Sequence, residues 1–177
     1  TAHRFLQPFP RDPRGLSSRK IAAPPARNLP RAQKHPSLKM KIRGPGQSSL
    51  LLLKVIKFLN ERHVPYAIVG AFAASFYGVV RASSDADAVI SLGDGEEKLH
   101  PLLSALKKDG LKTVLTRGDS RDPIRCVINI EDKFRNRVDL LIGISGMTED
   151  VFGRVRTASF LRAKIKLIGI EDFIAMK

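Results

Sequence analysis

Two aspartates separated by one residue are the side chains in this sequence best suited to chemistry. Asp85 and Asp87 lie in the segment Asp-Ala-Asp-Ala-Val-Ile-Ser at 85–91, whose residue types predict a β-strand. In a strand, residues i and i+2 point to the same face, about 7 Å apart, so the two carboxylates share a face while Ala86 and Ala88 pack on the other. Neighbouring acids with no base between them repel each other, and hard oxygen ligands of this kind favour Mg²⁺ or Mn²⁺ over zinc.

A third aspartate, Asp139, lies further along the chain in the apolar strand Val-Asp-Leu-Leu-Ile. An acid in such a run is seldom buried without a partner. If its strand lies beside the first, at a spacing of about 4.8 Å, the three carboxylates can bridge two ions roughly 4 Å apart, as in two-metal phosphoryl-transfer sites. The alternative for Asp139 is a salt bridge to Arg137, Arg125 or Arg81, and the alternative for Asp85 is a cap at a loop end.

A glycine turn lies one strand upstream of the two acids. Gly70 and Ala71 come between a short apolar strand and a helix expected at 71–77. A glycine at a strand end lets the backbone approach a ligand closely, and the first N–H groups of the following helix can bind an anion. Gly70, Ala71, Arg81 and Ser84 are therefore the candidate phosphate-binding residues, with a surface salt bridge as the alternative for Arg81.

Alternating strands and helices are predicted to position these residues. The expected strands cover 66–69, 85–91, 111–116, 124–130, 137–142 and 164–168, and the expected helices cover 50–62, 71–77, 99–106, 148–156 and 170–177. Ser48 or Ser49 is expected to cap the first helix, and Asp94 with Glu97 to form a capping box before the third. Because two of the strands are joined by a polar turn like a hairpin, the expected fold is a mixed sheet flanked by helices, of α/β (α+β) class.

The positive charge is concentrated near the N-terminus. The 177 residues are 43% hydrophobic, which suits a packed core, and carry a net charge of +14. Residues 1–45 hold 11 of the 31 basic residues, one of the 17 acids and 8 of the 11 prolines, so 1–46 is expected to be a disordered tail and 47–177 the folded domain. Three interpretations of the tail remain open: a nucleic-acid-binding arm, an organellar targeting segment, or a reading frame extended upstream of Met40, which would make 1–39 non-native.

The compartment is expected to be the cytoplasm. The single cysteine, Cys126, excludes an internal disulfide framework and a cysteine-rich zinc site, and it fits a reducing environment. The longest uncharged apolar stretch, 66–80, has 15 residues including two glycines, whereas a bilayer span needs about 20. No membrane partner is therefore expected.

Together the motifs resemble those of the polymerase β-like nucleotidyltransferase superfamily. Its signature is a hydrophobic residue, Gly, then Gly or Ser, a spacer of about nine to thirteen residues, and Asp-x-Asp or Asp-x-Glu between hydrophobic residues. Here Val69-Gly70-Ala71 is followed by thirteen residues and Asp85-Ala86-Asp87, and Asp139 matches the later acid. With Arg81, the pattern is similar to the small prokaryotic branch of minimal nucleotidyltransferases and abortive-infection toxins. In two departures, alanines replace the usual Gly or Ser at 71 and the larger apolar residues at 86 and 88.

The resemblance, which covers about 50–177, implies transfer of a nucleoside monophosphate from an NTP such as ATP to a hydroxyl of a protein or RNA acceptor. Asp85 and Asp87 would hold two Mg²⁺ or Mn²⁺ ions, and Asp139 would share one of them. In the toxin-like branch a helical lysine helps hold the triphosphate. Lys177 matches it but ends the chain, so the domain is expected to be truncated.

Two other classes of function stay open. One is a catalytically weak or inactive binding module of the same fold, acting as a toxin–antitoxin component with a cognate protein partner. The replacement at Ala71 favours this class, whereas the retention of all three aspartates favours the enzyme. The other class is a basic nucleic-acid-binding protein, which depends almost wholly on the tail.

Overall fold

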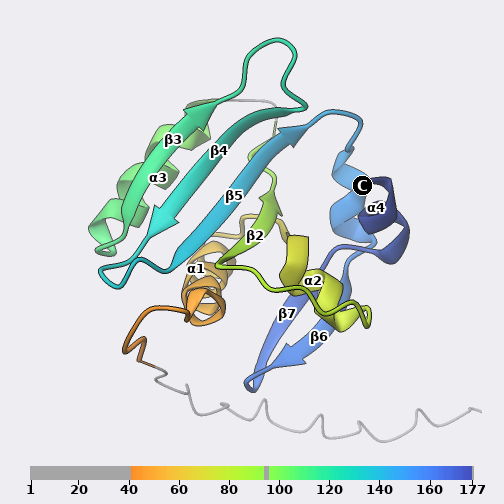
Figure 1. Cartoon of the computed structure of the whole chain (residues 1–177). Coiled ribbons are helices and arrows are strands. Elements are labelled where there is room, and N and C mark those ends of the chain that lie inside the picture. Colours follow the sequence, from red (N-terminus) through yellow and green to blue (C-terminus); the bar gives the residue numbers. More distant parts are fainter. Residues whose placement is uncertain (1–40, 94–95, 177) are drawn as a thin grey trace, which may run out of the picture. The chain divides into compact units, whose positions relative to one another are not determined.

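The computed structural model describes residues 41–93 and 96–176 and contains seven strands and four α-helices (Figure 1). The strands are β1 (Tyr66–Val69), β2 (Asp85–Ile90), β3 (Lys112–Arg117), β4 (Ile124–Glu131), β5 (Arg137–Ile144), β6 (Arg156–Phe160) and β7 (Ala163–Leu167). The helices are α1 (Ser48–Glu61), α2 (Gly70–Phe76), α3 (Leu99–Lys108) and α4 (Ile170–Ala175), with 3₁₀ turns at Glu96–Lys98 and Glu149–Gly153. Residues 1–40 of the expected tail, Asp94 of the expected capping box and Lys177 lie outside the described residues.

The strands form one sheet in the order β3-β4-β5-β2-β1-β7-β6. Strands β3, β4 and β5 are joined as an antiparallel meander, and β2 then pairs parallel with β5 and antiparallel with β1. On the far side β1 pairs parallel with β7, which forms an antiparallel hairpin with β6. The prediction of a mixed sheet flanked by helices is confirmed, and β2, which carries the two aspartates, lies at its centre.

The two faces of the sheet are covered unequally. On β4 and β5 every second residue is buried, as Ile128, Ile130 and Leu140 are, and α1 and α3 pack over this face (Figure 1). The residues between them, such as Asn129 and Asp139, are only half-buried on the opposite, open face. All four residues of β1 are buried. In the part of the chain that the structure describes, no helix combines the length and apolarity needed to cross a bilayer.

The first helix begins differently from the prediction. Gln47, not Ser48 or Ser49, is the N-cap residue, and its side chain makes no capping hydrogen bond. Ser48 is the first helical residue and is buried. Its hydroxyl donates to the carbonyl oxygen of Ser84 over 2.6 Å and accepts from the backbone N–H of Arg137 over 3.1 Å. The capping prediction is wrong because this hydroxyl instead ties α1 to the segment before β2 and to the start of β5.

The C-terminal part also departs from the prediction. The helix expected at 148–156 is a short 3₁₀ turn followed by β6, which the sequence did not predict. Strand β6 pairs with β7 through a tight turn in which Leu161 and Arg162 both have positive φ, 47° and 66°. Such a turn between non-glycine residues has no sequence signature, so the sequence predicts only the second strand of the hairpin, at 164–168, and assigns no element to 157–160.

Candidate active site

The three predicted carboxylates come together on the open face of the sheet. Strand β2 alternates between the half-buried Asp85 and Asp87 on this face and the fully buried Ala86 and Ala88 on the other. In the parallel pair of β2 and β5, Asp87 lies directly opposite Asp139. The spatial arrangement expected from the sequence is therefore present, with two acids from one strand and one from its neighbour.

The electrostatics of Asp87 show how close the three acids are. The pKa of this carboxyl is raised from its ordinary 3.8 to about 6, first by burial and then by the negative charges of Asp85 and Asp139. A carboxylate whose ionised form is disfavoured by both desolvation and like charges is stabilised by a proton or by a cation.

Gly70 lets the backbone approach this cluster. It has a φ of +64°, and a Cβ atom added to it would lie only 2.1 Å from Oδ2 of Asp87. Only glycine satisfies both conditions without displacing the carboxylate. The backbone at Gly70 therefore lies close to Asp87, and the approach to a ligand that the sequence suggests stays a prediction.

The other two carboxylates are held by neighbouring side chains. The Ser83 hydroxyl donates to Oδ1 of Asp85 over 2.5 Å, and the Asn129 amide donates to Oδ1 of Asp139 over 2.9 Å. Within 41–93 and 96–176, no three His, Cys, Asp or Glu side chains already form a complete metal site. The donor set nevertheless fits Mg²⁺ or Mn²⁺, because all of its ligand atoms are carboxylate oxygens. In addition, a bound cation would stabilise the ionised form of Asp87, which burial and the two neighbouring charges disfavour.

A cavity of about 330 Å³ lies beside Asp85 on the side of the glycine turn. Ala71, Arg81 and Ser84 all line it, so the structure brings three of the predicted phosphate-binding residues together with an acid of the cluster. Gly70 lies behind Asp87 rather than in the cavity wall. Arg81 is exposed, and among the described residues no acidic side chain forms an ion pair with it.

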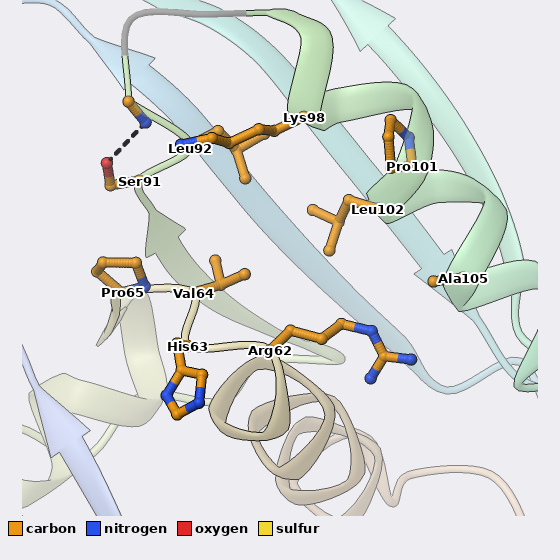
Figure 2. Close-up of a pocket in the computed structure, with 11 residues that line it drawn as sticks. Arg62, His63, Val64, Pro65, Ser91, Leu92, Lys98, Pro101, Leu102 and Ala105 are labelled. Carbon is orange, nitrogen blue, oxygen red and sulfur yellow. Dashed lines mark hydrogen bonds between the residues drawn. The ribbon is translucent and has the colours of Figure 1, made fainter.

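Two further cavities lie near β2, and one of them adjoins the carboxylates. One of about 300 Å³ lies on the β3–β4–β5 side of the carboxylates, where Asp85, Asn129, Lys112 and Asp139 line it. Asp85 thus borders a cavity on each side. A larger cavity of about 720 Å³ lies past the other end of β2, and its walls combine apolar side chains with basic ones such as Arg62 (Figure 2). The described residues that line the larger cavity include none of the three site carboxylates.

Comparison with known proteins identifies the architecture. No protein-family model and no curated protein matches the sequence. A Thermotoga maritima protein assigned as a nucleotidyltransferase matches the structure with a TM-score of 0.56 at 14% identity, over 76% of this chain and 84% of that one. ANT(2")-Ia, solved in complex with adenylyl-2"-tobramycin, matches with a TM-score of 0.51 at 18% identity, over 72% of each chain. The chain has the polymerase β-like nucleotidyltransferase fold.

The fold expected from the resemblance is confirmed. The glycine turn at the end of β1 and the two acids on β2 are the parts of that resemblance which the structure now places side by side. Two residues beside the acids were not predicted from the sequence: Ser83, which bonds Asp85, and Asn129, which bonds Asp139. The available signal for Asn129 was a single amide between two isoleucines of an apolar strand.

Proposed function

We propose that this chain is a metal-dependent nucleotidyltransferase that moves a nucleoside monophosphate from an NTP to a hydroxyl group of an acceptor. The observation that carries the proposal is the register of β2 and β5, which sets Asp87 opposite Asp139 on the open face with Asp85 two residues away. Three carboxylates in this arrangement, beside a cavity lined by Arg81 and Ser84, match the needs of phosphoryl-transfer chemistry.

The proposed reaction is an in-line displacement at phosphorus. The acceptor hydroxyl oxygen forms a bond to the α-phosphorus of the NTP, and the bond from that phosphorus to the bridging oxygen of the pyrophosphate group breaks. The hydroxyl proton passes to a carboxylate or to water, and pyrophosphate carries away the electron pair of the broken bond. No redox step and no covalent enzyme intermediate are involved.

The roles of the residues follow from their positions. Asp85, Asp87 and Asp139 would hold two divalent cations, which when bound lower the pKa of the acceptor hydroxyl and offset the charge of the triphosphate. Asp85 borders both smaller cavities, so a nucleotide beside Arg81 and Ser84 and an acceptor beside Asp139 would meet at this acid. Gly70 keeps the backbone close to Asp87, and Ala71 contributes its N–H in place of the usual hydroxyl.

The acceptor class is the finer part of the proposal. We expect a protein or RNA hydroxyl, with ATP as the first nucleotide to test. ANT(2")-Ia, which shares the fold, was solved with adenylyl-2"-tobramycin, so a hydroxylated small molecule belongs in the same screen. Incubation with each α-labelled NTP and Mg²⁺, alone and with extract protein, total RNA or aminoglycosides, identifies which of these three acceptor classes becomes labelled.

Asparagine variants of two of the three acids, Asp87 and Asp139, test the catalytic assignment. Asp87→Asn and Asp139→Asn keep the size of the side chain and remove its charge, and we expect labelling to fall at least about 100-fold. Asp109→Asn is the matched control, because Asp109 is an exposed acid at the end of α3 that belongs to no part of the site. Full labelling by Asp139→Asn would refute the proposal, as would equal losses in Asp139→Asn and Asp109→Asn.

The second candidate function is a binding module of the same fold, paired with a cognate protein as one half of a toxin–antitoxin system. The observations that favour it are Ala71 and the absence, among the described residues, of a complete set of three metal-ligating side chains. A chain that binds ATP but never releases pyrophosphate with any acceptor, and that co-purifies with a partner, would support this candidate over the enzyme.

A further inference from the structure

A row of polar side chains crosses the open face of the sheet and extends beyond the three carboxylates. Asp87 of β2 lies opposite Asp139 of β5, and Asp139 in turn lies opposite Asn129 of β4. Thr116 of β3 is the diagonal neighbour of Asn129, since Val114 is directly opposite Asn129. Adjacent strands are about 4.8 Å apart, so each of these polar residues is within reach of the next.

Two hydrogen bonds join the last three residues of this row. The Asn129 amide donates from Nδ2 to Oδ1 of Asp139 over 2.9 Å, and the Thr116 hydroxyl donates to Oδ1 of Asn129 over 2.9 Å. An ionised carboxylate only accepts hydrogen bonds, whereas a hydroxyl can also donate them. The amide therefore satisfies both neighbours in one orientation, with its NH₂ group toward Asp139 and its oxygen toward Thr116.

The strand itself does not call for an asparagine at this position. Asparagine is disfavoured in strands, where branched and aromatic residues pack better, and its neighbours Ile128 and Ile130 are fully buried on the opposite face. Within the described residues, Asn129 is the side chain that bonds Asp139, and it engages only the oxygen Oδ1. The hydrogen bond fixes the direction of one carboxylate oxygen and leaves Oδ2 for another ligand.

We infer that Asn129 is a positioning residue for Asp139 and that Thr116 orients Asn129. The inference rests on the proposed nucleotidyl transfer, in which Asp139 ligates a cation next to the acceptor hydroxyl. A carboxylate that is already oriented loses less side-chain freedom when it takes up this role, and supporting hydrogen bonds of this kind contribute to metal affinity and to rate. The effect of Asn129 on the reaction passes through Asp139.

The test compares Asn129→Leu, Asn129→Gln and Thr116→Val in the full chain. Mn²⁺ binding is followed by electron paramagnetic resonance, and transfer from labelled ATP gives kcat and the KM values for ATP and for the acceptor found in the screen. Asn129→Leu, which removes the donor at similar size, is expected to weaken Mn²⁺ binding or lower kcat about 10–100-fold. Thr116→Val removes only the group that orients the amide, and its loss is expected to be about 2–10-fold.

Three comparisons separate positioning from a general loss of structure. Asn129→Gln keeps an amide donor and should recover part of the loss, and Thr116→Val should cost nothing further in the Asn129→Leu background. Thr113→Val is the matched control, because Thr113 is on the same strand as Thr116 but faces the helix-covered side; it should change neither Mn²⁺ binding nor kcat. Melting curves without metal identify any variant that fails to fold. If Asn129→Leu fails to fold, the positioning role is tested on Asn129→Gln and Thr116→Val alone.

Two results would overturn the positioning role while leaving the proposed function intact. One is wild-type Mn²⁺ binding and kcat in folded Asn129→Leu. The other is a raised acceptor KM at constant kcat, which would mean that Asn129 contacts the acceptor directly. A wild-type chain that neither binds Mn²⁺ nor transfers the nucleotide would overturn the proposed function, and this inference with it.

Discussion

Removing the charge of Asp87 is expected to stabilise the metal-free protein. The pKa of this carboxyl is about 6 in the folded chain, against an ordinary value of 3.8, because burial and the charges of Asp85 and Asp139 disfavour the ionised form. Between these two values the folded state binds more protons than the unfolded state does. The free energy of unfolding therefore falls as pH rises through this window, and it stays lower at every higher pH.

The size of this effect follows from the two pKa values. One pKa unit corresponds to about 1.4 kcal/mol, so the difference corresponds to about 3 kcal/mol of destabilisation at neutral pH. Asp87 is only half-buried, and solvent screening reduces the expected figure to about 1–2 kcal/mol. Asp87→Asn, which cannot ionise, should be more stable than the wild type by that amount.

Urea unfolding in the presence of a chelator measures the prediction. The gain of Asp87→Asn should be complete at about pH 8 and absent at about pH 3, where the wild-type carboxyl is protonated in both states. Added Mg²⁺ should stabilise the wild type and not the variant, because the cation offsets the same repulsion. A variant that is no more stable than the wild type at about pH 8 without metal would refute the reasoning, since it would mean that burial and the neighbouring charges do not disfavour the ionised form of Asp87.

Three further substitutions test the framework of the site. Gly70→Ala should destabilise the fold by about 2–4 kcal/mol, measured by thermal unfolding, and abolish transfer, because the new methyl group would collide with Asp87 at an unfavourable φ; wild-type stability would contradict this. Thr113→Val should raise the free energy of unfolding by about 1 kcal/mol, since it removes a buried hydroxyl that has no hydrogen-bond partner in the described structure; a loss of stability would show that the hydroxyl is satisfied. Ser48→Ala should cost about 1–3 kcal/mol in chemical denaturation, because it breaks the link from α1 to Ser84 and to β5, whereas Ser49→Ala, next to it in the chain, should cost less.

The centre of the fold could be predicted from the sequence because its signals are local and agree with one another. Alternation of small apolar and acidic residues in β2 predicted both the strand and the shared face of Asp85 and Asp87. An acid between buried apolar residues marked Asp139 in the same way. The expectation that the acids share a cation predicted that their two strands are neighbours. The structure does pair β2 with β5, and Asp87 lies opposite Asp139.

The features that the sequence did not predict depend on pairing and side-chain contacts that the residue types alone do not indicate. Ser48 is a good N-cap residue by type, but its hydroxyl bonds a backbone group 36 residues away. Strand β6 has little apolar periodicity, and it is defined by pairing with β7 through a turn at Leu161 and Arg162 that lacks glycine. Asn129 is ordinary as a residue type and informative only because the register of β4 and β5 sets it opposite Asp139.

The central position of β2 has a consequence for how the site responds to a cation. Strand β2 pairs with a neighbouring strand on both sides. A register shift of one residue would turn Asp85 and Asp87 to the helix-covered face, where the buried Ala86 and Ala88 now pack. The mutual repulsion of the acids thus cannot be relieved by backbone movement. Binding of an ion then requires only rotations of side chains, which take picoseconds to nanoseconds. We therefore expect the backbone of β2 to have the same conformation with and without the bound ion.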